Sequence, residues 1–165
     1  MNRFIIADSN RCIGCRTCEL ACSMSHDHDI AISAASFSPR ITVIKEGDIT
    51  VPVMCKQCED APCAKACPTG ALVRENGLIA IHEEHCIGCK SCVVACPFGA
   101  IDIAMKGGKA TIIKCDLCVD SNTGPACISV CPTDALSLCD EQQLSALKQK
   151  KLLRTVNGDN RHLMG

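Results

Sequence analysis

The chain has 165 residues, enough for one ordinary domain or two very small ones. Seventeen cysteines make up about a tenth of it, while Trp and Tyr are absent and Phe occurs only three times. A core of this composition cannot rest on aromatic side chains, so a domain of this size needs covalent or inorganic cross-links. The formal net charge of −1, without a basic patch that carries aromatic residues, argues against a nucleic-acid partner.

In chain order, short strands alternate with groups of cysteines. We expect a first strand over Arg3–Ala7, ahead of the first group. Three hairpins follow, and their turns are Gly47-Asp48, Asn76-Gly77 and Gly107-Gly108, of which Asn-Gly is the strongest hairpin signal. The expected strands are Ile41–Lys45 with Ile49–Val53, Leu72–Val73 with Leu78–Ile81, and Ile101–Ala104 with Ala110–Ile113. A short helix should begin near the third cysteine of each group and end before the proline that follows the fourth.

Sixteen of the seventeen cysteines form four groups of four. The groups are Cys12, Cys15, Cys18 and Cys22; Cys55, Cys58, Cys63 and Cys67; Cys86, Cys89, Cys92 and Cys96; and Cys115, Cys118, Cys127 and Cys131. The last three end in repeated tails that begin Cys67-Pro68, Cys96-Pro97 and Cys131-Pro132, which marks an internal repeat. In the first group Ser23 stands where the others have proline.

The third group has the pattern C-x2-C-x2-C-x3-C-P, which is a known ligand run for a [4Fe–4S] cluster. The fourth cysteine of such a run ligates a neighbouring cluster, so one run implies another. Zinc also binds C-x2-C pairs, but zinc sites need neither the third closely spaced cysteine nor the fourth with its proline. The sequence therefore predicts four [4Fe–4S] clusters on sixteen cysteines, with zinc or disulfides as the alternatives. Cys139 is left over and should pack as a small apolar residue.

Two further expectations concern location and polar residues. Residues 1–8 contain no secretory signal, and no apolar run approaches the roughly 18 residues of a membrane span. We therefore expect a cytoplasmic protein whose cysteines stay reduced. His26, His28, His82 and His162 lie among polar residues and are expected to be solvated. No catalytic triad, paired-carboxylate site or phosphate-binding loop is apparent, so the chain is expected to transfer electrons without being an enzyme.

The cysteine spacing resembles that of the four-cluster ferredoxin subunits of molybdenum and tungsten oxidoreductases. The start Met1–Asp8 and the stretches Gln57–Cys63 and Lys114–Cys118 look closest to the small subunits of formate hydrogenlyase and of hydrogen-dependent CO2 reductase. The resemblance implies an α+β fold of two pseudo-symmetric ferredoxin-like units with short hairpins and helices. The units would be residues 1–30 with 100–138, and residues 40–99, followed by a C-terminal helix and tail over 139–165.

The resemblance also implies how the cysteine groups share clusters. Cluster one would be held by Cys12, Cys15, Cys18 and Cys131; cluster two by Cys115, Cys118, Cys127 and Cys22; cluster three by Cys86, Cys89, Cys92 and Cys67; and cluster four by Cys55, Cys58, Cys63 and Cys96. Electrons would run in that order, starting at the catalytic subunit of a formate dehydrogenase. The implied role is single-electron transfer between that enzyme and a hydrogenase or another iron–sulfur subunit. Two alternatives are an accessory or maturation protein for formate dehydrogenase and a free polyferredoxin carrier.

The tail lies beyond the cysteine pattern. Asp140 as N-cap with Gln143 three residues later predicts a helix over Glu141–Leu153. Its leucines do not share one face, so we expect either a solvated helix with a frayed end or docking onto another subunit. A second copy of this chain is one such partner, because related CO2 reductases assemble into filaments through small subunits of this kind.

Overall fold

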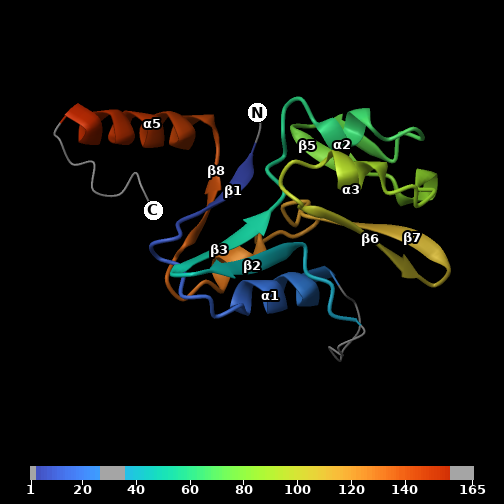
Figure 1. Ribbon diagram of the computed structural model, residues 1–165, viewed down its shortest axis with the longest axis horizontal. Coiled ribbons are helices and arrows are strands. Elements are labelled where there is room, and N and C mark those ends of the chain that lie inside the picture. The colour runs from blue at the N-terminus through green and yellow to red at the C-terminus, as the bar shows by residue number, and fades with distance from the viewer. Residues whose placement is uncertain (1–2, 27–35, 157–165) are drawn as a thin grey trace.

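The computed structural model describes residues 3–26 and 36–156, which form an α+β fold of short elements (Figure 1). Its strands form four separate two-stranded antiparallel sheets. The pairs are β1 (Phe4–Ala7) with β8 (Leu136–Cys139), β2 (Ile41–Glu46) with β3 (Ile49–Met54), β4 (Leu72–Glu75) with β5 (Leu78–Ile81), and β6 (Ile101–Lys106) with β7 (Lys109–Lys114).

The three predicted hairpins are confirmed. All three have two-residue turns, and in the one that joins β4 and β5 Leu72 pairs with Ile81. Its turn residues Asn76 and Gly77 have φ angles of 50° and 80°. Two consecutive positive φ angles are the requirement of a type I′ turn, which Asn-Gly meets at little steric cost.

The pairing of β1 with β8 joins the two ends of the cysteine-bearing region. The strand over Arg3–Ala7 is confirmed, but its partner β8 was not predicted from the sequence. Phe4 lies opposite Cys139 in this sheet, and Cys139 is fully buried, as expected of a small apolar side chain. The sheet therefore ties residues near the N-terminus to residues just after the last cysteine group.

The helices follow the cysteine groups as predicted, with one difference. They are α1 (Thr17–His26), α2 (Pro62–Lys65), α3 (Ser91–Ala95) and α4 (Ala126–Ser129), and a 3₁₀ turn, η1 (Glu83–His85), precedes the third group. The three short helices end before Pro68, Pro97 and Pro132. Helix α1 continues past its fourth cysteine because Ser23, unlike proline, can donate its backbone N–H. Helix α1 packs against α4, and α2 packs against α3.

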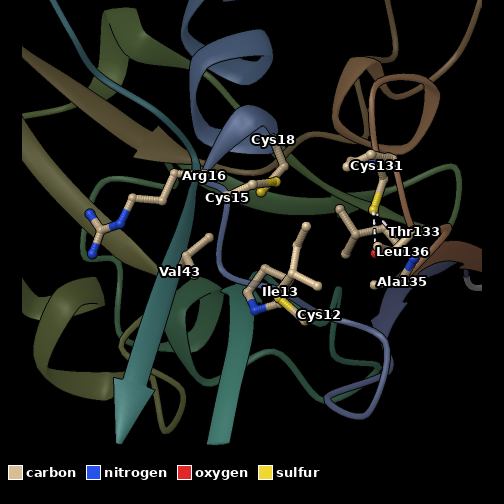
Figure 2. Close-up of a pocket in the computed structure, with 12 residues that line it drawn as sticks. Cys12, Ile13, Cys15, Arg16, Cys18, Val43, Cys131, Thr133, Ala135 and Leu136 are labelled. Carbon is tan, nitrogen blue, oxygen red and sulfur yellow. Dashed lines mark hydrogen bonds between the residues drawn. The ribbon is translucent and has the colours of Figure 1, made fainter.

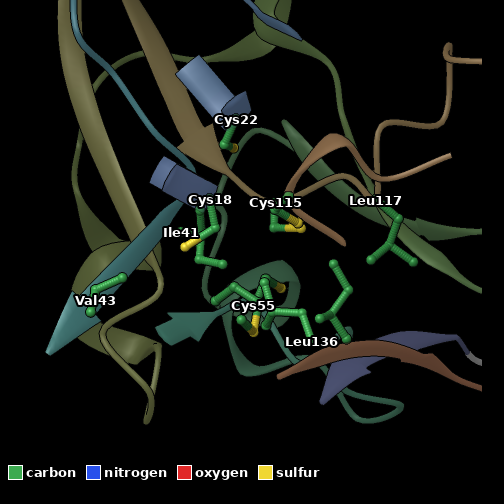
Figure 3. Close-up of a cluster of buried hydrophobic side chains, with 11 residues drawn as sticks. Cys18, Cys22, Ile41, Val43, Cys55, Cys115, Leu117 and Leu136 are labelled. Atoms are coloured by element: carbon green, nitrogen blue, oxygen red, sulfur yellow. The ribbon is translucent and has the colours of Figure 1, made fainter. Parts of the chain in front are cut away.

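The buried side chains form two hydrophobic cores. The first includes Ile5, Ile41, Met54 and Leu136 and is drawn in Figure 3. The second includes Leu72, Ile79, Ile101 and Ile112. Residues of the β2–β3 hairpin thus lie in the core that also holds β1 and β8, whereas residues of β6–β7 lie in the core with β4 and β5.

Helix α5 (Glu141–Val156) lies beside β8 and away from the two cores (Figure 1). The predicted capping box is confirmed: the Gln143 N–H donates to Asp140 Oδ1 at 2.8 Å, and the Asp140 N–H donates to Gln143 Oε1 at 3.1 Å. The helix runs three residues further than predicted, and every one of its residues is exposed. None of the helices in residues 3–26 and 36–156 is long and apolar enough to cross a bilayer.

Candidate metal centres

The four C-x2-C loops share one backbone feature. The third residue of each loop has a positive φ angle, between 49° and 71°: Gly14, Gln57, Gly88 and Leu117. At Gly14 and Gly88 glycine is also needed for space, because an added Cβ would lie 2.9 Å from Thr50 and 3.2 Å from Ala110. The C-Ile-Gly-C loops therefore pack directly onto the hairpins β2–β3 and β6–β7.

The first cysteine set combines the first group with the end of the fourth. Cys12, Cys15, Cys18 and Cys131 all line one small cavity of about 20 Å³ (Figure 2). Val43 and Leu136 contribute apolar surface to the same cavity. Residues more than a hundred positions apart are brought together here because β1 pairs with β8 and α1 packs against α4.

The second set combines the end of the first group with the fourth. Cys22, Cys115 and Cys127 are buried in the first core (Figure 3). Burial raises the pKa of Cys127 to about 12, and the charges of Cys115, Cys22 and Cys118 add to the increase. These thiols are therefore neighbours in a site from which water is largely excluded.

For the remaining two sets, an exchange of the fourth cysteines Cys67 and Cys96 is expected. In the fourth set, burial raises the pKa of Cys63, and the charges of Cys55 and Cys96 raise it further. Burial also raises the pKa of Cys58, and the charges of Cys55 and Cys96 raise it further.

In the third set, burial raises the pKa of Cys92, and nearby Cys67 and Cys89 add to the effect. Cys92 is buried in the second core, and Cys86 packs against that core. These neighbourhoods agree with the expected exchange of fourth cysteines between groups, which stays a prediction.

The contacts between the sets favour another order than the expected electron path in its last two steps, and the path itself stays a prediction. Cys55 of the fourth set lies in the first core together with Cys115 of the second set, and its charge acts on the Cys115 thiol. The order in space is therefore first, second, fourth and third set. Spacing alone could not show this, because it depends on which core Cys55 joins.

Backbone N–H groups point at the sulfur atoms. The N–H groups of Ala71, Ala100 and Ala135 donate to Cys67, Cys96 and Cys131 at 3.2 to 3.4 Å. In each repeated tail Cys-Pro-x-x-Ala, the donor is the backbone of the residue four positions after the cysteine. The first group lacks this tail, and there the N–H of Arg40 donates to Cys22 Sγ at 3.3 Å. N–H groups directed at sulfur stabilise the thiolate form and tune the potential of a bound cluster.

The cysteines differ strongly in exposure. Cys15 and Cys89 are exposed, and the hydrogen bonds that they form with the side chains of Thr17 and Ser91 lower the pKa of each thiol. At the buried extreme, desolvation raises the pKa of Cys115 to about 12. A metal that binds a buried thiol of this kind would have to displace its proton.

His26 is not solvated, contrary to the expectation from sequence. Its imidazole donates from Nε2 to Asp116 Oδ1 at 3.1 Å and from Nδ1 to the Cys22 carbonyl at 2.7 Å. Asp116 also accepts a hydrogen bond from the Arg40 guanidinium. The bond to Asp116 raises the pKa of His26 to about 12. Burial alone would raise the pKa of Asp116, but His26 and Arg40 together hold it below its usual range.

This ion triad stands beside the second set and was missed from the sequence. Its members come from α1, the residue just before β2 and the fourth cysteine group, so no local pattern joins them. Only the longer α1, with Ser23 in place of proline, brings His26 to Asp116. His82 is half-buried and lies 3.3 Å from Glu75, while His28 and His162 lie outside the described residues.

The residues present fit iron–sulfur clusters. All seventeen cysteines are free, which argues against a disulfide framework. Sixteen of them belong to the four spaced groups, and Cys12, Cys15, Cys18 and Cys131 line one cavity with apolar side chains. The spacing follows a [4Fe–4S] ligand pattern. Fold and site together define an iron–sulfur protein of the ferredoxin class.

Comparison with known proteins places the chain within that class. Residues 48–141 match the family model of a 4Fe-4S dicluster domain, and residues 9–25 match that of a 4Fe-4S binding domain. The chain is 53% identical over 147 residues to YsaA of Escherichia coli (strain K12), with 87% of this chain and 94% of YsaA covered. It is 46% identical over 172 residues to the E. coli K12 electron transport protein HydN, covering 94% and 98% of the two chains.

Formate hydrogenlyase subunit 2 of the same strain is 37% identical over 192 residues, covering 96% of this chain and 92% of that subunit. The chain therefore belongs to the 4Fe-4S dicluster family. The resemblance to the iron–sulfur proteins of formate hydrogenlyase is confirmed.

Proposed function

We propose that the chain is an iron–sulfur electron-transfer subunit that carries single electrons between a formate dehydrogenase and a hydrogenase. It would hold four [4Fe–4S] clusters, one on each cysteine set, and perform no catalytic step itself. Similarity to an electron transport protein and to a formate hydrogenlyase subunit supports this role. The sixteen cysteines of the four sets are the proposed ligands.

The observation that carries the proposal is the gradient of burial along the sets. The first set, with Cys15, and the third set, with Cys89, each include an exposed cysteine. The second and fourth sets lie between them and include no exposed cysteine: Cys22, Cys115 and Cys127 are buried in the second set, and Cys55 and Cys63 in the fourth. Electrons would enter and leave at the exposed ends, while the central clusters would be shielded from water and adventitious oxidants.

We further propose the two-unit organisation, with residues 1–30 and 100–138 in one unit and 40–99 in the other. Helix α1 packs on α4 and α2 packs on α3, and each of these four helices carries the third cysteine of its own group. This repeated helix pair supports a pseudo-symmetric arrangement. The two long hairpins cross these boundaries, because β2–β3 contributes to the first core and β6–β7 to the second.

The partners we propose are the molybdenum or tungsten catalytic subunit of a formate dehydrogenase and a hydrogenase or further iron–sulfur subunit. A third contact is self-association through residues 139–165. The full exposure of α5 supports it, since Leu152 and Leu153 are 58% and 57% exposed. We assign the protein to the cytoplasm, where free thiols are maintained.

The test is anaerobic purification of the tagged full chain from its native host. The proposal predicts that formate dehydrogenase and hydrogenase subunits co-purify with it in fixed stoichiometry. Recovery of a redox-active monomer alone would support a free carrier instead. Recovery with maturation factors, without the catalytic subunits, would support an accessory role.

A further inference from the structure

A lysine is completely buried between two of the cysteine sets. Lys114, the last residue of β7, has no solvent-exposed surface and is the largest fully buried side chain among the described residues. It forms no ion pair with a carboxylate in residues 3–26 and 36–156. Burying a charge without a counter-charge is strongly unfavourable, so this ammonium group requires an anion close by.

The candidates for that anion are the two neighbouring cysteine sets. Lys114 Nζ donates to the Cys115 carbonyl at 2.8 Å and lies 3.9 Å from Cys55 Sγ. Cys115 belongs to the second set and Cys55 to the fourth, and both are buried in the first core (Figure 3). The ammonium group therefore lies at the junction between the two central sets.

Hydrogen bonding alone does not account for a lysine here. The Cys115 carbonyl also accepts a hydrogen bond at 2.7 Å from Nε2 of Gln57, which is fully buried too. Gln57 Oε1 accepts from the Ile79 N–H at 3.0 Å, so the amide is satisfied at both ends. Because a neutral donor already serves this carbonyl, what Lys114 adds is its positive charge.

The charge acts on thiols of both sets. Desolvation dominates the raised pKa of Cys115, and the charge of Lys114 opposes the increase. Burial and Cys55 raise the pKa of Cys63, which Lys114 again partly offsets. In each case the lysine favours the anionic form of sulfur.

We propose that Lys114 is a fixed counter-charge for the two central clusters and raises both of their reduction potentials. The inference rests on the proposed function, since it needs clusters on the second and fourth sets. A four-thiolate cluster carries about −2 when oxidised and gains one negative charge with each electron accepted. A positive charge at the junction stabilises the reduced form of either cluster.

The reach of this charge is limited, because electrostatic interactions weaken with distance. Its polar contacts are confined to Cys115 and Cys55, so the clusters of the exposed first and third sets should be little affected. Lys114 would thus raise the reduction potentials of the two central clusters relative to those of the clusters at the two ends of the electron path.

The test is a redox titration of the full anaerobically purified chain, followed by paramagnetic resonance of each cluster. Lys114→Met should shift two of the four potentials to more negative values and leave the other two unchanged. The two shifted signals should be those altered in Cys118→Ser and Cys58→Ser, which report on the second and fourth sets. Lys109→Met is the matched control, because Lys109 is exposed on the same strand and should change none.

A charge-conserving variant separates charge from structure. Lys114→Arg should keep the wild-type potentials, whereas Lys114→Gln should shift the same two potentials as Lys114→Met. Selective iron loss from the second and fourth sets in the neutral variants, with retention in Lys114→Arg, would also support the proposal. Four unchanged potentials in Lys114→Met, a uniform shift of all four, or equal damage in the Arg, Gln and Met variants would overturn it. A wild-type chain without four clusters would instead contradict the proposed function itself.

Discussion

The exchange of fourth cysteines makes a sharp prediction at Cys96. Cys96 follows α3 and the ligand triplet of its own group, yet its charge acts on Cys58 and Cys63 of the second group. Cys92, four residues earlier, is instead influenced by Cys67 and Cys89. Cys96→Ser should therefore damage the cluster held by Cys55, Cys58 and Cys63 and spare the cluster of its sequence neighbours.

The expected loss of iron follows from the composition of one cluster. Each cubane contains four iron atoms and takes four cysteines, so complete loss of one cluster removes about a quarter of the iron, from about 16 to about 12 atoms per chain. If serine oxygen replaces the thiolate, iron is retained and only the potential and resonance signal of that one cluster change. Iron analysis and paramagnetic resonance of the reduced protein distinguish the two outcomes.

Comparison with other variants identifies the damaged cluster. The altered signal in Cys96→Ser should be the one altered in Cys58→Ser and not the one altered in Cys89→Ser. Cys139→Ser is the control, since Cys139 is buried but belongs to none of the four sets; its iron content should match the wild type. If Cys96→Ser changes the Cys89 signal and leaves the Cys58 signal intact, the exchange of cysteines is wrong.

Two further predictions concern the periphery of the clusters. Asp116→Asn leaves Arg40 and His26 without their shared anion. It should therefore lower the free energy of unfolding by roughly 2–3 kcal/mol. This is less than the full cost of breaking a buried ion pair, because the triad is partly exposed. The visible iron–sulfur absorbance should then disappear at lower urea than in the wild type or in the exposed control Asp120→Asn, and coincident curves for all three would refute the role of the triad. Deletion of residues 140–165 should leave the iron content unchanged while weakening assembly, because α5 lies outside both cores. Anaerobic size-exclusion chromatography with mass measurement checks this, and a full-sized complex from the truncated chain would show that the tail does not contribute to assembly.

Local signals in the sequence were sufficient for the elements that local physics determines. Asn76-Gly77 specifies a type I′ turn, and Asp140 with Gln143 specifies a helix start, whatever surrounds them. The prolines after the fourth cysteines likewise end three helices. These features need no information from distant parts of the chain.

Strand β8 was missed although a signal was present. Ala135-Leu136 follows the fourth group as Ala71-Leu72 and Ala100-Ile101 follow the second and third, and each of those pairs leads into a strand. The other two strands have a hairpin partner next in sequence, which made them recognisable. The partner of β8 is β1, at the other end of the chain, and alternation over four residues alone is a weak signal.

The features around the cysteines that sequence reasoning missed all depend on long-range contacts. His26 meets Asp116 across 90 residues, and Lys114 meets Cys55 across 59. Gln57 tolerates its positive φ angle while its side chain bridges Cys115 and Ile79. The sequence does not show which distant residue a polar side chain will contact, so the burial of such residues can be recognised only in the structure.

The central claim is that sixteen cysteines hold four electron-carrying clusters, and metal analysis tests it most directly. The full chain, purified without exposure to oxygen, should contain about 16 iron and about 16 acid-labile sulfide per molecule, and stepwise reduction should reveal four paramagnetic clusters. Zinc in stoichiometric amounts with little iron or sulfide would contradict the account.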